Sequence, residues 1–201
     1  MRIEDVAVAL LAAGRSARFG AADKRLADLD GRPLIQWSAA AGRALATGHR
    51  FAITGPGDAL EAVLPDYGIV RNPHPGTGLS GSLRHAAMAA RDAGATAMLV
   101  LLADMPFVRV DHLRHMIEIA RADPGRAIFS AGDAGPQPPA LFPAVLYPAL
   151  MALHGPEGAR SLAEQANRVA ADPVSLFDVD TPDDLVRAAR IAMSIIPRRP
   201  D

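Results

Sequence analysis

The chain has 201 residues, half of them hydrophobic, which is enough apolar material for the core of one α/β domain. Its formal net charge of −1 argues against bulk electrostatic binding to nucleic acid or to an anionic membrane. The absence of cysteine excludes disulfides, thiolate metal sites and a cysteine nucleophile.

The first residues lack the charged-then-apolar order of a secretory signal, because Glu4 and Asp5 precede a short apolar run. The longest apolar run, residues 97–103, is too short to span a bilayer. We therefore expect a soluble cytoplasmic protein with neither a membrane nor a nucleic acid as partner.

Short apolar runs alternate along the chain with longer segments in which apolar residues recur with helical period. The apolar runs predict strands at residues 6–11, 51–54, 68–71, 97–102, 127–130 and 138–142. The periodic segments predict helices at residues 33–45, 58–64, 79–94, 111–122, 144–153 and 183–195. Serines at the start of the 79–94 segment and Gly94 at its end are typical helix-capping residues.

This order of elements is typical of an α/β protein whose mostly parallel sheet is covered by helices on both faces. We predict a single-domain, Rossmann-like three-layer α/β/α sandwich over residues 1–196, followed by a frayed tail at residues 197–201. Ligands of such sheets lie outside the carboxyl ends of the strands, so the residues directly after each strand are the candidate site residues.

A glycine-rich segment, LAAGRSARFGAADK at residues 11–24, follows the first predicted strand and ends in the only lysine of the chain. Glycine lets backbone amides approach an anion closely, and Arg18 and Lys24 add full positive charges. Close amides together with cations suit the phosphates of a nucleoside triphosphate. The Walker spacing is not met, because Lys24 lies four residues after Gly20. The alternative is an ordinary surface loop with solvated charges.

A second glycine-rich segment, GTGLSG at residues 76–81, formally matches the dinucleotide-binding pattern. That pattern needs a strand directly before it and an acidic residue about twenty positions later, for the ribose. Here NPHP intervenes, and the residues about twenty positions later are LVLLA, so a Rossmann cofactor site is disfavoured. The simpler alternative is the N-terminus of a helix.

Acidic residues follow the predicted strands at two further places. Asp104 comes directly after the most apolar strand, where a carboxylate is costly to desolvate unless a cation such as Mg²⁺ or a set of donors meets it. Asp178 and Asp180 lie two positions apart and share one face if the chain is extended. The alternatives are that Asp104 is a turn residue and that the other two acids stabilise the start of the last helix, together with Thr181 and Asp183.

The histidines give no metal site by spacing. His112 and His115 lie three positions apart on a predicted helix, but no third ligand is indicated nearby. We expect both on a solvated helix face.

Several of these segments together resemble the MobA-like nucleotidyltransferases. LAAGRSARFGAADKRL followed by DGRPLI resembles the signature L-A-x-G-x-S-x-R-x-G…K…G-x-P-L of that family. GLSGSL resembles its base-and-ribose loop, LADMP its metal motif (with Ala103 where glycine is usual) and DVDTPDDL the element that supplies a second metal ligand. The resemblance spans nearly the whole chain.

The resemblance implies a fold of the nucleotide-diphospho-sugar transferase type and specific roles for the motif residues. It implies Mg²⁺ bound by Asp104, by Asp180 and, second to Asp180, by Asp178. It also implies that Arg18 and Lys24 are catalytic and stabilise charge on the phosphates of a bound NTP. The implied nucleotide-binding residues are Leu11, Ala12, Ala13, Gly14, Ser16, Arg18, Lys24, Gly78, Ser80 and Ser82.

The acceptor half matches less completely. GPQPPALF and the later HGPEGAR resemble the acceptor motifs, with Pro138 where histidine is usual and Pro156 where aspartate is usual. Gly158, Ala159 and Arg160 are retained. Ala13 stands where guanylyl-specific members tend to have a second glycine, which favours CTP over GTP.

The implied reaction transfers a nucleoside monophosphate, CMP from CTP in the favoured case, to a phosphate-bearing acceptor and releases pyrophosphate. A phosphate nucleophile is already ionised near neutrality, so no strong general base is needed. The resemblance favours molybdopterin as acceptor, with a molybdoenzyme as a possible partner. Two alternatives stay open: another acceptor such as a sugar phosphate, and a non-catalytic chaperone that holds the molybdenum cofactor.

Overall fold

The structure is a computed structural model that describes residues 1–14, 19, 23–133, 135–155 and 158–195. Two of the candidate site residues, Ser16 and Arg18, lie outside these ranges, as does the tail predicted at residues 197–201. Within the described part, no helix is both long enough and apolar enough to cross a membrane.

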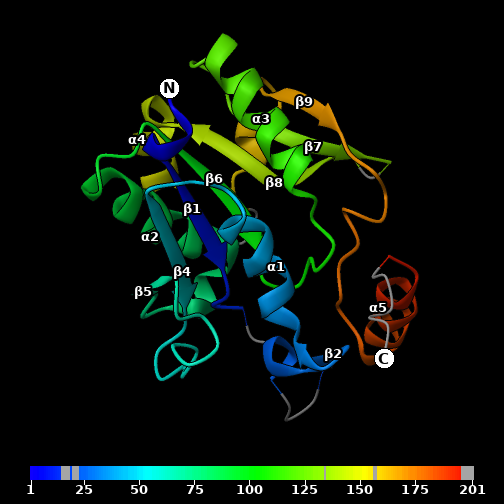
Figure 1. The fold of residues 1–201 in the computed structure, drawn as a ribbon. Coiled ribbons are helices and arrows are strands. Elements are labelled where there is room, and N and C mark those ends of the chain that lie inside the picture. The colour runs from blue at the N-terminus through cyan, green and yellow to red at the C-terminus, as the bar shows by residue number, and fades with distance from the viewer. Residues whose placement is uncertain (15–18, 20–22, 134, 156–157, 196–201) are drawn as a thin grey trace.

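A seven-stranded sheet forms the centre of the molecule, in the order β5-β4-β1-β6-β8-β7-β9 (Figure 1). Its strands are β1 (Val6–Leu11), β4 (His49–Thr54), β5 (Gly68–Arg71), β6 (Ala97–Leu102), β7 (Ile128–Gly132), β8 (Gly135–Pro143) and β9 (Asn167–Ala170). β8 is antiparallel to both of its neighbours, and the other pairs are parallel. The mostly parallel sheet predicted from the sequence is confirmed.

Helices cover both faces of the sheet, as the fully buried strands require. The helices are α1 (Leu34–Arg43), α2 (Gly78–Asp92), α3 (Val110–Ala122), α4 (Tyr147–Met151) and α5 (Pro182–Ile195). Alternate residues of β1 point to opposite faces: Val8 and Leu10 pack in the cluster that contains α1 and α3, whereas Ala7 and Ala9 pack with α2 and α4. The three-layer α/β/α sandwich is therefore confirmed.

α5 lies beside the sandwich, close to the short strand β2 (Asp28–Leu29), which pairs with β3 (Arg32–Pro33) (Figure 1). A third apolar cluster holds it there and includes Trp37, Phe107 and Val179. The Val179 N–H group donates to the carbonyl oxygen of Asp104 at 3.0 Å. This contact fixes the segment before α5 against the carboxyl end of β6.

The helix predicted at residues 58–64 is wrong, because the structure has only turns there. The N–H groups of Val63 and Leu64 reach the Leu60 carbonyl, which makes about one turn. Pro65 then disfavours helical geometry at the residue before it. The Asp58 side chain, at the expected helix start, instead accepts hydrogen bonds from Gly55 and from Arg25, which belongs to the first loop (residues 12–27, between β1 and β2).

The predicted C-terminal cap of α2 is confirmed, whereas its predicted N-terminal caps are wrong. At its C-terminal end, Gly94 has φ +70°, and the N–H groups of Gly94 and Ala95 close a Schellman motif on Arg91 and Ala90. At its N-terminal end, the predicted serine caps are wrong: no side chain caps the helix, which begins at Gly78, and its serines lie inside the first turns.

Candidate active site

An open pocket of about 450 Å³ lies at the carboxyl ends of β1 and β6, beside the N-terminal turn of α2. The register explains this position, since Leu11 pairs with Leu102 and both strands therefore end at the same level. Of the described residues, fifteen line it: Leu11, Ala12, Ala13, Gly14, Lys24, Arg25, Leu34, Pro75, Gly78, Leu79, Ser82, Leu102, Ala103, Asp104 and Asp180. The pocket is where an α/β sheet places a ligand.

Most of the residues predicted to bind nucleotide lie in this pocket lining. Residues 11–14 come from the end of β1, Lys24 from the first loop, and Gly78 and Ser82 from α2. Gly78 has φ +70° and ψ −156°, a conformation that only glycine adopts without strain. Gly78 and Ser82 are four residues apart and therefore share one face of the helix.

Ser80, also predicted to bind nucleotide, lies outside the lining of this pocket. It is two residues from both Gly78 and Ser82, so it lies on another face of α2. Its buried hydroxyl donates to the carbonyl oxygen of His154 at 3.4 Å and accepts from the N–H group of Gly158 at 3.1 Å. The structure thus connects Ser80 to the 154–158 segment.

Three carboxylates converge as the sequence predicted for Asp104, Asp178 and Asp180, and two of them, Asp104 and Asp180, line the pocket. Their ligand oxygens all lie within 4.8 Å of one another. Asp104 follows β6, and the other two flank the fully buried Val179, which turns both carboxylates to the same side. The fold thus brings Asp104 together with two acids that follow it by more than 70 positions in the sequence.

The N-terminus of α5 is capped by side chains that do not belong to this carboxylate cluster. Thr181 Oγ1 accepts from the Asp184 N–H group at 3.2 Å, and Asp184 Oδ2 accepts from the Thr181 N–H group at 3.0 Å. This reciprocal pair is a capping box. The prediction that Thr181 starts the helix is confirmed, but its acidic partner is Asp184 and the exposed Asp183 takes no part.

Lys24 points into the carboxylate cluster. Its ammonium nitrogen lies 2.8 Å from Asp104 Oδ2 and 3.3 Å from Asp180 Oδ1, and its side chain is only 8% exposed. Burial disfavours the charged form, but the carboxylates of Asp104, Asp178 and Asp180 outweigh burial and leave the pKa of Lys24 raised. Lys24 is therefore a buried ammonium ion.

One ammonium group does not neutralise three carboxylates. Partial withdrawal from water and the charges of Asp104 and Asp180 raise the pKa of Asp178 to about 7, although Lys24 opposes the shift. Asp104 Oδ1 is buried, and no N–H or alcohol hydroxyl group of the described residues donates a hydrogen bond to it. An anionic oxygen cluster with an unpaired buried oxygen fits a hard divalent cation such as Mg²⁺.

Arg25 also lines the pocket, a position that the sequence did not single out. Its guanidinium faces away from the carboxylate cluster, toward Asp23 and toward Asp58 in the β4–β5 connection. Asp58 lies 33 residues away, with no spacing pattern that relates it to the first loop.

The two histidines predicted to be solvated differ in the structure. His115 is exposed, as expected. His112 is half-buried, and its Nε2 lies 2.8 Å from the hydroxyl of the fully buried Ser130. Among the described residues, neither belongs to a group of possible metal ligands.

A second, smaller pocket of about 230 Å³ adjoins the first, and the two share Leu11, Leu79 and Leu102. Its remaining lining is mostly apolar and comes from α2 and β6, from β7 and β8, and from the 159–163 segment. Among the described residues that line it, Gln137 and Arg160 are the polar ones. Two adjoining pockets with an acidic cluster at one of them suit an enzyme that brings two substrates together.

The mostly parallel sheet has the nucleotide-diphospho-sugar transferase fold, and its strand ends carry this pocket, a buried lysine and a carboxylate cluster. The chain belongs to the MobA-like NTP transferase domain family, whose sequence model matches residues 8–170. The family predicted from the sequence motifs is thereby confirmed.

Two curated relatives show how far the similarity extends. Molybdenum cofactor guanylyltransferase of Cereibacter sphaeroides is 31% identical over 184 residues, which cover 89% of this chain and 93% of that protein. Purine catabolism protein PucB of Bacillus subtilis (strain 168) is 35% identical over 108 residues, 50% of this chain. That match spans about half (51%) of PucB.

Among solved structures, Rv0371c from Mycobacterium tuberculosis H37Rv superimposes with a TM-score of 0.80 and 24% identity, covering 94% of this chain and all of that one. A structure of Rv0371c in complex with manganese has a TM-score of 0.71 at the same identity, covering 92% of this chain and 98% of that one. At this identity the likeness concerns the fold.

Proposed function

We propose that this enzyme transfers CMP from CTP to a phosphate-bearing acceptor, with molybdopterin as the favoured acceptor and Mg²⁺ as cofactor. The observation that carries the proposal is the contact of Lys24 with Asp104 and Asp180 in a pocket at the ends of β1 and β6. A basic group and a set of metal-type carboxylates are what a triphosphate and its cation require.

Asp104, Asp180 and Asp178 would hold the Mg²⁺ ion, which when bound supplies positive charge to the phosphate oxygens. Lys24 would move its ammonium group from the carboxylates to the phosphates. The amides of residues 12–14, directly after β1, would approach the phosphates closely because Gly14 has no side chain and no atom of the described residues crowds the place of its missing Cβ. Arg18 is proposed as a further cation from the same loop.

In the reaction, an acceptor phosphate oxygen attacks the α-phosphorus of the NTP and forms a new P–O–P linkage. The bond from the α-phosphorus to the oxygen that bridges to the β-phosphorus breaks, and pyrophosphate leaves with the electron pair. No proton has to be removed from the nucleophile, so positioning and charge stabilisation suffice.

The acceptor is proposed to occupy the second pocket. This pocket adjoins the first and contains Ala159 and Arg160, the retained part of the acceptor motif. Its apolar walls suit a flat ring system better than a polyhydroxylated sugar, which favours a pterin over a sugar phosphate. The relative from Cereibacter sphaeroides is named for the molybdenum cofactor, which supports the same acceptor.

The choice between CTP and GTP rests on Ala13, which is buried in the pocket lining. A methyl group there leaves less room for a purine than glycine would. GTP is the second candidate, because the relative that covers most of this chain is named a guanylyltransferase.

The test is pyrophosphate release from CTP, GTP, ATP and UTP, each with molybdopterin, with a sugar 1-phosphate and with no acceptor. We expect release with CTP and molybdopterin and only in the presence of Mg²⁺ or Mn²⁺. Ala13→Gly should increase the relative use of GTP. Binding of molybdenum cofactor without pyrophosphate release from any NTP would favour the chaperone, which hands the cofactor to a molybdoenzyme.

A further inference from the structure

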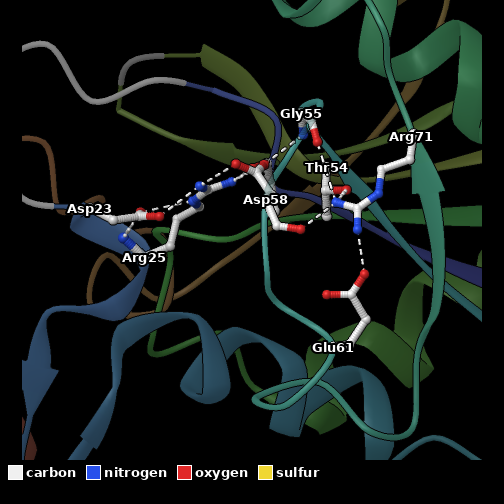
Figure 2. A network of polar contacts seen from close by, with 8 residues as sticks. Asp23, Arg25, Thr54, Gly55, Asp58, Glu61 and Arg71 are labelled. Atoms are coloured by element: carbon white, nitrogen blue, oxygen red, sulfur yellow. Dashed lines mark hydrogen bonds and ion pairs between the residues drawn. The ribbon is translucent and has the colours of Figure 1, made fainter.

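Arg25 is the centre of a polar network between the first loop and the β4–β5 connection (Figure 2). Its Nε and Nη2 donate to Asp23 at 2.8 and 2.6 Å, and its Nη1 and Nη2 donate to Asp58 at 2.6 and 3.0 Å. Nη1 also donates to the carbonyl oxygen of Ala12. A guanidinium has five N–H groups, and all five have an acceptor here.

Because all five N–H groups of Arg25 have acceptors within the protein, Arg25 has no donor left for a ligand in the pocket. Its side chain is 13% exposed and lines the wall, but every N–H group is already engaged within the protein. With Asp23 and Asp58 it forms a group of net charge −1, which does not attract an anion. Arg25 therefore does not serve as a phosphate ligand, although it stands next to Lys24.

Lys24 and Arg25 begin a single short 3-10 turn, Lys24–Leu26, and their side chains leave it in opposite directions. Lys24 reaches Asp104 after β6, whereas Arg25 reaches Asp58 after β4. β6 and β4 lie on opposite sides of β1 in the sheet. The turn is thus held from both sides, and Arg25 also holds the end of β1 through Ala12.

Asp58 is itself held by hydrogen bonds to residues other than Arg25. Its Oδ2 accepts from the Gly55 N–H group at 2.6 Å, and its carbonyl oxygen accepts from Arg71 Nη1 at 2.5 Å. Arg71 comes from β5 and donates to Thr54 Oγ1 at the end of β4 (Figure 2). Asp58, which holds Arg25 of the first loop, is therefore itself connected to β4 and β5.

We propose that Arg25 and Asp58 are positioning residues that fix the Lys24–Leu26 turn and thereby direct the Lys24 side chain into the pocket, toward the carboxylate cluster. That this placement of Lys24 matters for catalysis rests on the proposed function. The placement itself is independent of any reaction. A planar fork held by two carboxylates resists both translation and rotation, which a lysine at residue 25 would not. A loop rich in glycine and alanine has little other means of fixing the direction of one long side chain.

Lys24 offers an unusually direct test, because it is the only lysine of the chain. Full-length protein labelled with ε-¹⁵N-lysine gives one side-chain signal, which reports the surroundings of the Lys24 ammonium without any substrate. The variants are Asp58→Asn and Arg25→Gln, and the second leaves the Asp58 bond to Gly55 available. Glu61→Gln is the matched control, since it removes one charge from the same connection but contacts Arg71 and not Arg25.

We expect the Lys24 signal to shift or broaden in Asp58→Asn and in Arg25→Gln, and to stay at the wild-type position in Glu61→Gln. We also expect kcat to fall about tenfold or more in the first two variants, with less than about threefold change in KM for the NTP. An unchanged Lys24 signal in either folded variant would overturn the proposal, even if its thermal stability falls. If the wild type itself releases no pyrophosphate, the proposed function fails while the NMR result still decides the positioning role.

Discussion

The ammonium nitrogen of Lys24 lies 2.8 Å from a carboxylate oxygen of Asp104, across 80 positions of sequence. The contact joins the first loop to the end of β6, and both residues line the 450 Å³ pocket. Because it uses a carboxylate that is also suited to a metal ion, the lysine and a bound metal ion would compete for the same negative charge. The first predictions follow from this pair.

Removal of the Asp104 charge is expected to impair both metal binding and turnover. Asp104→Asn keeps the size of the side chain, so the fold should persist, while affinity for Mn²⁺ and the rate of pyrophosphate release should each fall about 100-fold. Mn²⁺ binding is measured by electron paramagnetic resonance and turnover by pyrophosphate release. Asp183→Asn, which changes an exposed acid outside the cluster, is the control. Wild-type values for Asp104→Asn would make Asp104 only a turn residue.

The ammonium of Lys24 is expected to weaken metal binding in the absence of nucleotide. Lys24→Gln removes one positive charge from the centre of the cluster, so Mn²⁺ should bind severalfold more tightly than in the wild type. Turnover should nevertheless be lost, because the charge that Lys24 would offer to the phosphates is gone. Mn²⁺ affinity equal to or weaker than that of the wild type would show that the lysine does not compete with the ion.

Arginine is not expected to replace Lys24. The side chain of Lys24 is 8% exposed between two carboxylates, where a compact ammonium fits and a broad planar fork has to displace a neighbour. Lys24→Arg should stay folded and bind CTP, with turnover reduced at least about tenfold. Steady-state kinetics and calorimetric titration with CTP measure the two effects, and wild-type turnover would mean that residue 24 contributes charge alone.

His112 is expected to make the free energy of unfolding depend on pH. Burial, with a smaller contribution from the charge of His115, lowers the pKa of His112 below its usual value of about 6.5. The unfolded chain therefore binds more protons between the two pKa values, so stability rises with pH through this window and is lost as pH falls. The free energy of unfolding, measured by urea denaturation at several pH values between 5 and 8, should rise less steeply with pH in His112→Gln than in the wild type. His115→Gln, at an exposed position, removes only the smaller contribution to the shift and should keep most of the wild-type pH dependence.

Gly42 is expected to tolerate no side chain. A Cβ added there would press on the Tyr67 hydroxyl and lie 2.9 Å from Val8 Cγ1, inside the buried interface of α1 with the sheet. Alanine is the better helix former by about 1 kcal/mol, but overpacking costs about 1–3 kcal/mol, so we expect Gly42→Ala to lower the free energy of unfolding. Gly125→Ala, which meets only Asp123 Oδ1 at 3.9 Å, is the control for chemical denaturation. Equal stability of the two variants would contradict the steric argument.

Local sequence was a good guide wherever a segment's own residues decide its conformation. The apolar runs gave β1 and β6, Gly94 gave the end of α2, and the strand-end position of Asp104 indicated a charged site. The helix expected at residues 58–64 failed because Pro65 and the engagement of Asp58 by other segments oppose it. The serines of α2 failed as caps for a similar reason, since Ser80 has partners 74 and 78 positions away.

The sequence by itself therefore determined six of the seven strands of the main sheet, most of the helices and the types of residue that follow each of those strands, but it did not indicate β9 or the short strands β2 and β3. Only the tertiary structure decided which of those residues meet: Lys24 with Asp104 and Asp180, and Arg25 with Asp58. The order of strands in the sheet sets those distances, and charge and burial then select among the side chains within reach. Neither the strand order nor the competition between side chains is encoded in the spacing of one segment, because both depend on packing between segments far apart in the chain.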